Sequence, residues 1–122
     1  MKIPKKWTMT TADRCFADFI KARDGKCQKC GCRNNLTCSH FVRRNIFALR
    51  YNPQNCITLC LLCHRRWEDD KNGEYQSFME EHIGAVALIN LWHTYHGPIM
   101  KKREAVERCR ELLNGQYERS CK

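Results

Sequence analysis

Two pairs of cysteines have the spacing of a metal-binding site. Each pair has the form Cys-x-x-Cys; the first is Cys27 with Cys30, and the second is Cys60 with Cys63. Such a turn places two thiolates on one side of a tight knuckle, and two knuckles complete a tetrahedral four-sulfur shell for Zn²⁺. Because four sulfurs leave no open position on the metal, this ion would hold structure and take no part in catalysis. The sequence therefore predicts one structural zinc.

The chain has ten cysteines, so other roles for them have to be weighed. Cys32 and Cys38 are near enough in sequence to compete for a ligand place, but the spacing in Cys30-Gly31-Cys32 is too tight for the usual knuckle. The roles of Cys32, Cys38 and Cys56 are left open. The alternative to zinc is that one pair is redox-active or simply buried, yet neither pair lies in the strand–helix–strand pattern of a thioredoxin-like site.

Two histidines and one asparagine lie between the cysteine pairs or directly after them. Closure of the zinc site would bring His40, Asn55 and His64 around one cleft. Phosphodiester hydrolysis needs a base to activate water, a group to hold that base, and a divalent cation to stabilise charge on the phosphate. We predict His40 as the base, Asn55 as its orienting partner and His64 as a ligand of the catalytic cation. A neutral imidazole with a pKa near its usual value of about 6.5 suits proton abstraction at neutral pH.

Each of these residues also has a simpler interpretation. A single histidine beside a zinc knuckle is often a capping or hydrogen-bonding residue, and Asn55 alone would be read as a turn residue. Their order and spacing around two CxxC pairs is more specific than any one of them. The alternative is a zinc-ribbon module that binds DNA or protein without catalysis. Under that hypothesis the presence of His40, Asn55 and His64 in this order is a coincidence.

Arginines flank both histidines: Arg43, Arg44, Arg50, Arg65 and Arg66. The whole chain has 22 Lys and Arg against 13 Asp and Glu, a formal net charge of +9. Such a surplus favours a polyanion, because every neutralised phosphate releases a condensed counterion. We predict that these arginines bind DNA phosphates, which the guanidinium fork grips bidentately. The alternative is an ordinary solvated loop.

The elements that must position these residues indicate an α+β chain of one domain, 1–122. A zinc-bound core would occupy 10–72, and a C-terminal helical extension would occupy 74–115. Apolar periodicity, caps and Gly or Pro breaks predict the individual elements. They are a helix over 11–23, strands over 37–42 and 56–59, and helices over 61–70, 74–83, 85–95 and from Pro98 to Leu113.

The basic start of the chain lacks the apolar stretch of a signal peptide. No apolar run approaches the roughly 20 residues that span a bilayer, so we expect no membrane partner. We expect a cytoplasmic protein whose thiols stay reduced, which favours metal ligands over disulfides.

The order CxxC, His40, Asn55 and CxxC followed by His64 resembles the HNH endonucleases. Within that group the chain looks most like the Rap/NinG recombination nucleases of lambdoid phages. The shared features, over about 8–115, are Asp13-Arg14, Phe19-Ile20, Arg23-Asp24-Gly25, both CxxC pairs, His40-Phe41, the run Arg50 to Asn55, Tyr75 and His82-Ile83-Gly84.

This resemblance implies a zinc-stapled ββα-metal (HNH) core with an N-terminal helix and C-terminal helices. It further implies a DNA endonuclease that uses Mg²⁺ or Mn²⁺ to cut branched recombination intermediates, such as D-loops and junctions, in the cytosol of a phage host. The alternatives are an HNH nicking or restriction-like nuclease on ordinary duplex and the non-catalytic module. A homodimer formed through the C-terminal helices is also open.

Two positions depart from the family pattern. Many HNH enzymes have Asp directly before the base as a cation ligand, where this chain has Ser39, a poor ligand for a hard cation. Some relatives have Asn after the second CxxC, where this chain has His64. Asp69 and Asp70 could complete the cation shell, although solvated helix charges explain them more simply.

Overall fold

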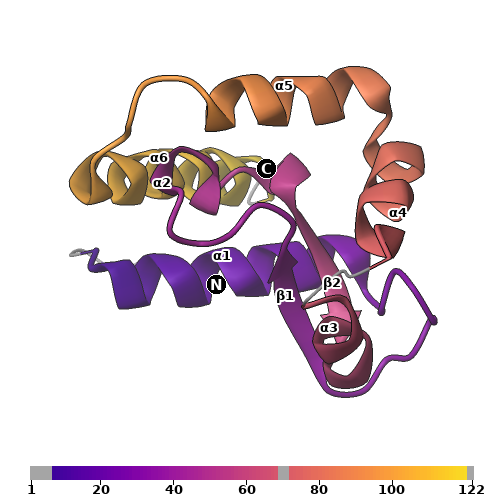
Figure 1. Cartoon of the computed structure of the whole chain (residues 1–122). Helices are drawn as coiled ribbons and strands as arrows, with labels where there is room; N and C mark the ends of the chain where they lie inside the picture. Colours follow the sequence, from indigo (N-terminus) through magenta and orange to yellow (C-terminus); the bar gives the residue numbers. More distant parts are fainter. Residues whose placement is uncertain (1–6, 69–71, 121–122) are drawn as a thin grey trace.

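The computed structural model describes residues 7–68 and 72–120 and contains a small mixed α/β chain (Figure 1). Its sheet has two strands, and several helices surround them. The elements in chain order are α1 (Met9–Asp24), β1 (Leu36–His40), α2 (Phe47–Arg50), the 3-10 helix η1 (Pro53–Asn55), β2 (Cys56–Cys60), α3 (Leu61–Trp67), α4 (Glu74–Ile83), α5 (Ala85–Tyr95) and α6 (Lys102–Ser120). Within the described ranges, no helix has both the length and the apolar character needed to cross a bilayer.

Helix α1 is set by caps at both ends. The Thr8 side chain accepts a hydrogen bond from the Thr11 amide at 3.2 Å, so the helix begins two residues earlier than predicted. Gly25 ends it with φ 73°, a left-handed conformation that glycine adopts without strain, and donates its N–H to the Lys21 carbonyl. The buried face of α1 packs against α6 and both strands.

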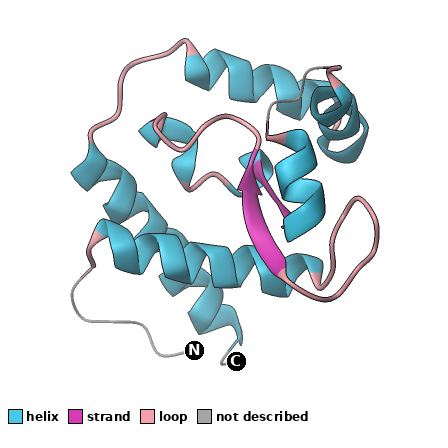
Figure 2. Ribbon diagram, turned by 60° about the horizontal axis from the view of Figure 1, so that its bottom comes forward, coloured by secondary structure: helices cyan, strands magenta, loops and turns pink. Residues whose placement is uncertain are grey.

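The two strands form an antiparallel pair in which His40 faces Cys56 and Leu36 faces Cys60. Strand β2 is buried along its whole length, whereas β1 is mostly half-buried. An isolated hairpin is marginal in water, so the surrounding helices have to stabilise it (Figure 2).

The free edge of β2 is covered by the segment that follows α1. The Thr58 amide donates to the Asp24 carboxylate at 2.8 Å, and the Thr58 carbonyl accepts from the Gln28 amide at 2.9 Å. Burial raises the pKa of Asp24, but the bonds from Arg23 and Thr58 outweigh it and leave the pKa below its usual value. The start of the first cysteine knuckle is thereby fixed beside β2.

Two apolar clusters lie on opposite faces of the sheet. Ile57 and Leu59 belong to the cluster that includes residues of α3, α4 and α5, whereas Cys56 belongs to the cluster that α1 and α6 form. This division follows from the alternation of side chains along a strand. Because β2 is buried on both faces, its residues are apolar at every position except Thr58. The Thr58 hydroxyl is also buried, and it donates to the Ile20 carbonyl at 3.3 Å.

A partly buried ion-pair network joins α1 to the segment after β1. Two nitrogens of Arg50 contact the Asp13 carboxylate at 2.9 and 2.6 Å, and the Tyr51 hydroxyl donates to it at 2.8 Å. Arg44 adds a contact at 3.2 Å. Burial raises the pKa of Asp13, but the Arg50 and Tyr51 hydrogen bonds and nearby positive charge together hold it below its usual value. The folded structure therefore stabilises the ionised form of Asp13.

Several predicted boundaries shift for identifiable reasons. Helices α4 and α5 have the predicted bounds. Strand β1 ends at His40 instead of residue 42, because the Asn55 side chain takes the hydrogen bonds of Val42 that a partner strand would make. Helix α6 begins at Lys102 and runs past Gly115, since a helical glycine costs only about 1 kcal/mol and does not by itself end a helix.

We predict that Asp13→Asn lowers the free energy of unfolding by about 2 kcal/mol, because it leaves the Arg50 guanidinium buried without a counter-charge. Urea denaturation of the zinc-loaded protein at neutral pH measures this loss. The control is Asp18→Asn on the same helix, whose ion pair with Lys21 is exposed and should be worth less than about 0.5 kcal/mol. Equal losses in the two variants would show that the network adds nothing specific.

Candidate metal centre and adjoining cleft

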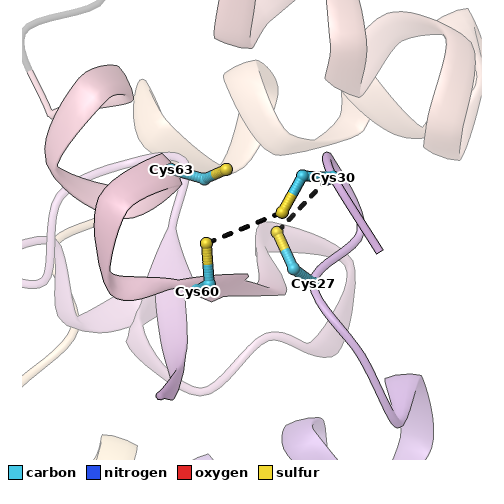
Figure 3. Close-up of side chains that lie close together, drawn as sticks. All are labelled: Cys27, Cys30, Cys60 and Cys63. Carbon is cyan, nitrogen blue, oxygen red and sulfur yellow. Dashed lines mark hydrogen bonds between the residues drawn. The ribbon is translucent and has the colours of Figure 1, made fainter. Parts of the chain in front are cut away.

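The four sulfurs of the two CxxC pairs lie together. Their Sγ atoms are all within 4.8 Å of one another, and the Cys30 and Cys60 sulfurs are 3.7 Å apart. Figure 3 shows the four side chains converging from two separate segments. A tetrahedral zinc with bonds of about 2.3 Å separates its sulfur ligands by about 3.8 Å, so the spacing suits a structural zinc ion. We call Cys27, Cys30, Cys60 and Cys63 the four-cysteine cluster.

The local backbone builds each half of this cluster. In the first knuckle the Cys30 amide donates to the Cys27 sulfur at 3.4 Å, and Gly31 turns the chain with φ 80° while donating to the Cys27 carbonyl. In the second, Cys60 ends β2 and Cys63 lies in the first turn of α3. Cys32 stays outside the cluster, with its sulfur accepting from the Asn34 amide at 3.4 Å. The spacing argument that favoured Cys30 over Cys32 thus agrees with the geometry.

The electrostatics of the cluster favour one thiolate before any metal binds. Burial opposes charge on Cys27, but backbone amides of Cys30, Cys60 and Lys29 outweigh it and lower the pKa to about 6. Burial and the neighbouring thiols instead raise the pKa of Cys63. A metal ion that binds all four as thiolates must therefore displace protons, which makes its affinity pH-dependent.

Beside the four-cysteine cluster, a cleft of about 1120 Å³ runs along the outer edge of β1 between α1 and α3. Its walls combine polar, basic and aromatic side chains from these three elements, from α4 and from the segments after β1 and α3. The residues that line it are Thr10, Asp13, Arg14, Phe16, Ala17, Cys38, Ser39, His40, Phe41, Arg43, Arg44, His64, Trp67, Glu68 and Tyr75. Both predicted catalytic histidines are among them.

His40 is half-buried, and its hydrogen bond defines the state of its ring. The Nε2 atom lies 2.8 Å from the Arg50 carbonyl oxygen. Because a carbonyl only accepts, Nε2 carries the proton and Nδ1 carries the free lone pair. Burial, assisted by the charges of Arg44 and Arg50, lowers the pKa of His40 to about 4. The ring is therefore neutral at physiological pH and able to accept a proton.

A similar argument assigns the tautomer of His64. The Thr37 hydroxyl donates its only proton to the Leu59 carbonyl at 2.7 Å, so at the 2.8 Å contact with His64 the donor is the ring Nδ1. The lone pair of His64 is then on Nε2. Burial lowers the pKa of this ring, against an opposing effect of Glu68. A neutral imidazole whose second nitrogen is held by an outer hydrogen bond is the usual form of a metal-binding histidine.

The two histidines share the cleft but contact opposite faces of β1. His64 bonds Thr37, and Thr37 and His40 are an odd number of residues apart on a strand whose side chains alternate. His40 instead packs near the Phe16 ring of α1, with 6.3 Å between ring centroids. At about 3.3 Å per residue, roughly 10 Å of strand separates His40 from Thr37, the residue that His64 contacts. The fold thus brings the two histidines to one cleft but not into contact with each other.

Asn55 does not contact the His40 ring through any described hydrogen bond. It is fully buried, and its side chain accepts from the Val42 amide at 2.7 Å and donates to the carbonyls of Val42 at 3.0 Å and Leu49 at 3.1 Å. These bonds close the loop that carries the Arg50 carbonyl. Asn55 therefore positions His40 through that loop, and the predicted direct pairing is not seen.

The predicted arginines fall into three places. Arg43 and Arg44 are exposed and line the cleft, whereas Arg65 and Arg66 are exposed on α3 outside its lining. Arg50 lies where sequence reasoning did not place it: it is buried, 6% exposed, and held by Asp13. Because the Arg50 guanidinium is buried and paired with Asp13, it is not available to bind a DNA phosphate.

Sequence reasoning gave no role in the site to several residues that line the cleft, among them Arg14, Glu68 and Tyr75. Arg14 lines it from α1, and Glu68 lines it four residues after His64. The Tyr75 hydroxyl contacts the Ser39 hydroxyl at 2.8 Å. Ser39, which stands where many HNH enzymes have Asp, is therefore buried and hydrogen-bonded to Tyr75. Glu68 could have been predicted from the sequence, because residues four apart on a helix lie on the same face and Glu68 follows His64 by four. Asp69 and Asp70, also considered as cation ligands, lie outside the described residues.

Comparison with known proteins places this chain in no group: it matches no protein-family model, no curated protein and no solved structure.

We predict that Cys63→Ser removes the tightly held zinc and destabilises the central region, because three sulfurs leave the shell of a structural zinc incomplete. Elemental analysis after passage over a weak chelator gives zinc per chain, and hydrogen exchange follows the amides of β2. Cys32→Ser is the matched control, since it removes a neighbouring thiol outside the cluster. Zinc retained by Cys63→Ser, or lost equally from Cys32→Ser, would contradict the assigned ligand set.

We predict that Asn55→Ala costs about 3 kcal/mol of unfolding free energy, because it leaves the buried polar groups of Val42 and Leu49 without partners. Asn52→Ala, in the same loop, removes only an exposed cap from the Gln54 amide and should cost about 1 kcal/mol or less. Chemical denaturation of the two variants compares these costs directly. A loss for Asn55→Ala no larger than the Asn52→Ala loss would remove its positioning role.

Proposed function

We propose that this chain is a metal-dependent DNA endonuclease of the HNH type, in which the four-cysteine cluster holds zinc and the adjoining cleft hydrolyses a phosphodiester bond. The observation that carries the proposal is the cleft itself, where His40 and His64 each present a lone pair fixed by a neighbour. The chain order β1, β2, α3, with one histidine on the first strand and the other on the helix, supports assignment to the ββα-metal group.

In this proposal His40 is the general base. Its Nε2 proton is held by the Arg50 carbonyl, so Nδ1 takes a proton from the attacking water. The low pKa makes His40 a weak base but keeps it unprotonated at neutral pH. Asn55 maintains the loop that provides the Arg50 carbonyl, and it is a positioning residue, because no described contact joins it to the cleft.

The divalent cation of this reaction has two candidate donors in the chain. His64 and Glu68 both line the cleft and are one helical turn apart. Among residues 7–68 and 72–120, His64 belongs to no group of three ligands, so water and DNA phosphate would complete the shell. That donor set fits Mg²⁺ or Mn²⁺, because Mg²⁺ keeps several waters and takes few protein ligands. When bound there, the cation would stabilise charge on the phosphate and leaving oxygen.

The DNA backbone would enter along the basic side of the cleft. Arg14, Arg43 and Arg44 line it, and the net charge of +9 supports attraction of a polyanion. These contacts position phosphates without reading bases. Branched DNA is the substrate class that we propose, on the resemblance to recombination nucleases, with ordinary duplex as the competing substrate.

We predict that the protein cleaves DNA in Mg²⁺ or Mn²⁺ and that His40→Ala lowers the rate at least about 100-fold, because a positioned base contributes roughly 10²–10⁴. Labelled linear duplex, Y-fork and four-way junction are incubated with wild type and variant. The control is His93→Ala, a histidine of α5 outside the cleft lining, which should cleave as wild type. His64→Ala should raise the cation concentration needed for half-maximal rate.

The same assay separates the competing functions. Cleavage of only the branched substrates supports a recombination nuclease, whereas equal cleavage of all three supports a nicking or restriction-like enzyme. DNA binding without cleavage in either metal would leave a non-catalytic zinc-binding module. Full activity of His40→Ala would remove this residue from the role of base.

A further inference from the structure

A second group of metal-binding atoms lies on the α1 side of the sheet. The sulfurs of Cys38 and Cys56 and one ring nitrogen of His40 are within 4.8 Å of one another. We propose that Cys38, His40 and Cys56, here called the hairpin cluster, form a second binding site for Zn²⁺ or a similar thiophilic cation. This site is separate from the four-cysteine cluster and shares no ligand with it.

The strand register creates the hairpin cluster. His40 faces Cys56 directly across the two strands, and Cys38 lies two residues before His40 on the same face of β1. The three donors therefore come from rigid, paired strands, and they approach one another without any change in the backbone. Cross-strand and diagonal neighbours of this kind are close enough for side chains to act together.

The donor chemistry selects the class of cation. Two thiolates and one imidazole suit zinc, whereas Mg²⁺ and Mn²⁺ prefer oxygen. Three protein ligands leave a fourth position for water, so this zinc would not have the closed shell of a structural site. Binding forms two metal–sulfur bonds and one metal–nitrogen bond and releases two thiol protons to solvent, so Zn²⁺ with two thiolates and a neutral imidazole has no net charge. A neutral site can be buried at far smaller cost than an ion alone.

Two further features suit a metal ligand at His40. Its Nε2 donates to the Arg50 carbonyl, which is the outer hydrogen bond that orients a ligating histidine and leaves Nδ1 for the metal. Cys38 and His40 line the cleft, whereas Cys56 lies behind them, 1% exposed. The cation thus has an entry path, and it is the opening that DNA would use.

The consequence for activity rests on the proposed function. A zinc ion on His40 occupies the lone pair that would take a proton from water, so the filled hairpin cluster and general-base catalysis exclude each other. Zinc at the four-cysteine cluster stabilises the fold, whereas zinc at the hairpin cluster inhibits the nuclease. The two sites therefore give the same metal opposite effects.

Cobalt titration tests the site without any need for activity. Protein with one zinc per chain is kept reduced and titrated with Co²⁺, and tetrahedral thiolate coordination is followed through its d–d and charge-transfer bands. We expect one further equivalent to bind in wild type and in Cys32→Ser. Cys38→Ser and Cys56→Ser should each weaken binding by at least about 100-fold, because even the loss of an outer-shell partner costs roughly 10–100-fold.

Zinc release is measured in the same samples to detect exchange at the four-cysteine cluster. Bands that survive both Cys38→Ser and Cys56→Ser, or accompany loss of the first zinc, assign the cobalt elsewhere and overturn the proposal. Absence of bands in wild type also overturns it. Because Cys38 is only half-buried, Cys38→Ser remains informative even where Cys56→Ser fails to fold.

A second measurement tests the inhibition separately. Cleavage in Mg²⁺ is compared with and without added Zn²⁺, and we expect the ratio of the two rates to fall in wild type and to stay near one in Cys38→Ser. Equal inhibition of both proteins would place the inhibitory zinc outside the hairpin cluster. If no DNA is cleaved by any variant, the nuclease proposal fails, while the cobalt result still decides whether the second site exists.

Discussion

Four sulfurs from two distant segments meet at the end of β2, and the geometry of the cleft depends on that meeting. Helix α1 ends shortly before Cys27, and α3 contains Cys63, so each wall of the cleft is attached to one half of the four-cysteine cluster. Structural zinc in small modules contributes on the order of 10 kcal/mol to folding. A metal bound there would fix the two walls relative to each other and would stabilise a small core.

The hydrogen bonds around the four-cysteine cluster extend this constraint into the sheet. The Asp24 carboxylate and the Gln28 amide saturate the free edge of β2 at Thr58, so the open edge of the sheet is on β1. The cleft follows that open edge because it is where polar side chains remain accessible to solvent. The position of the candidate site is thus a consequence of which strand edge the first knuckle covers.

Sequence reasoning succeeded where the information is local and failed where it depends on partners far along the chain. The CxxC spacing predicts four sulfurs that do lie together and could hold a metal, and Gly73 and Gly84 predict the bounds of α4. Arg50 was expected at the surface because its acidic partner, Asp13, is 37 positions away. The same holds for the ring state of His64, which depends on a threonine hydroxyl whose proton is already given to another strand.

Both proposals depend on the one free lone pair of His40. It would either accept a proton from water or bind a metal ion. The bond from His40 to the Arg50 carbonyl fixes the proton on Nε2 in either case, so the choice lies in what reaches Nδ1. In the proposed nuclease the partner of Nδ1 is a water in the cleft, and in the proposed second site it is a cation shared with the sulfurs of Cys38 and Cys56. A zinc ion held by the four-cysteine cluster would have no open coordination position. A chain built this way would retain its structural zinc while its chemistry responds to the supply of a second ion.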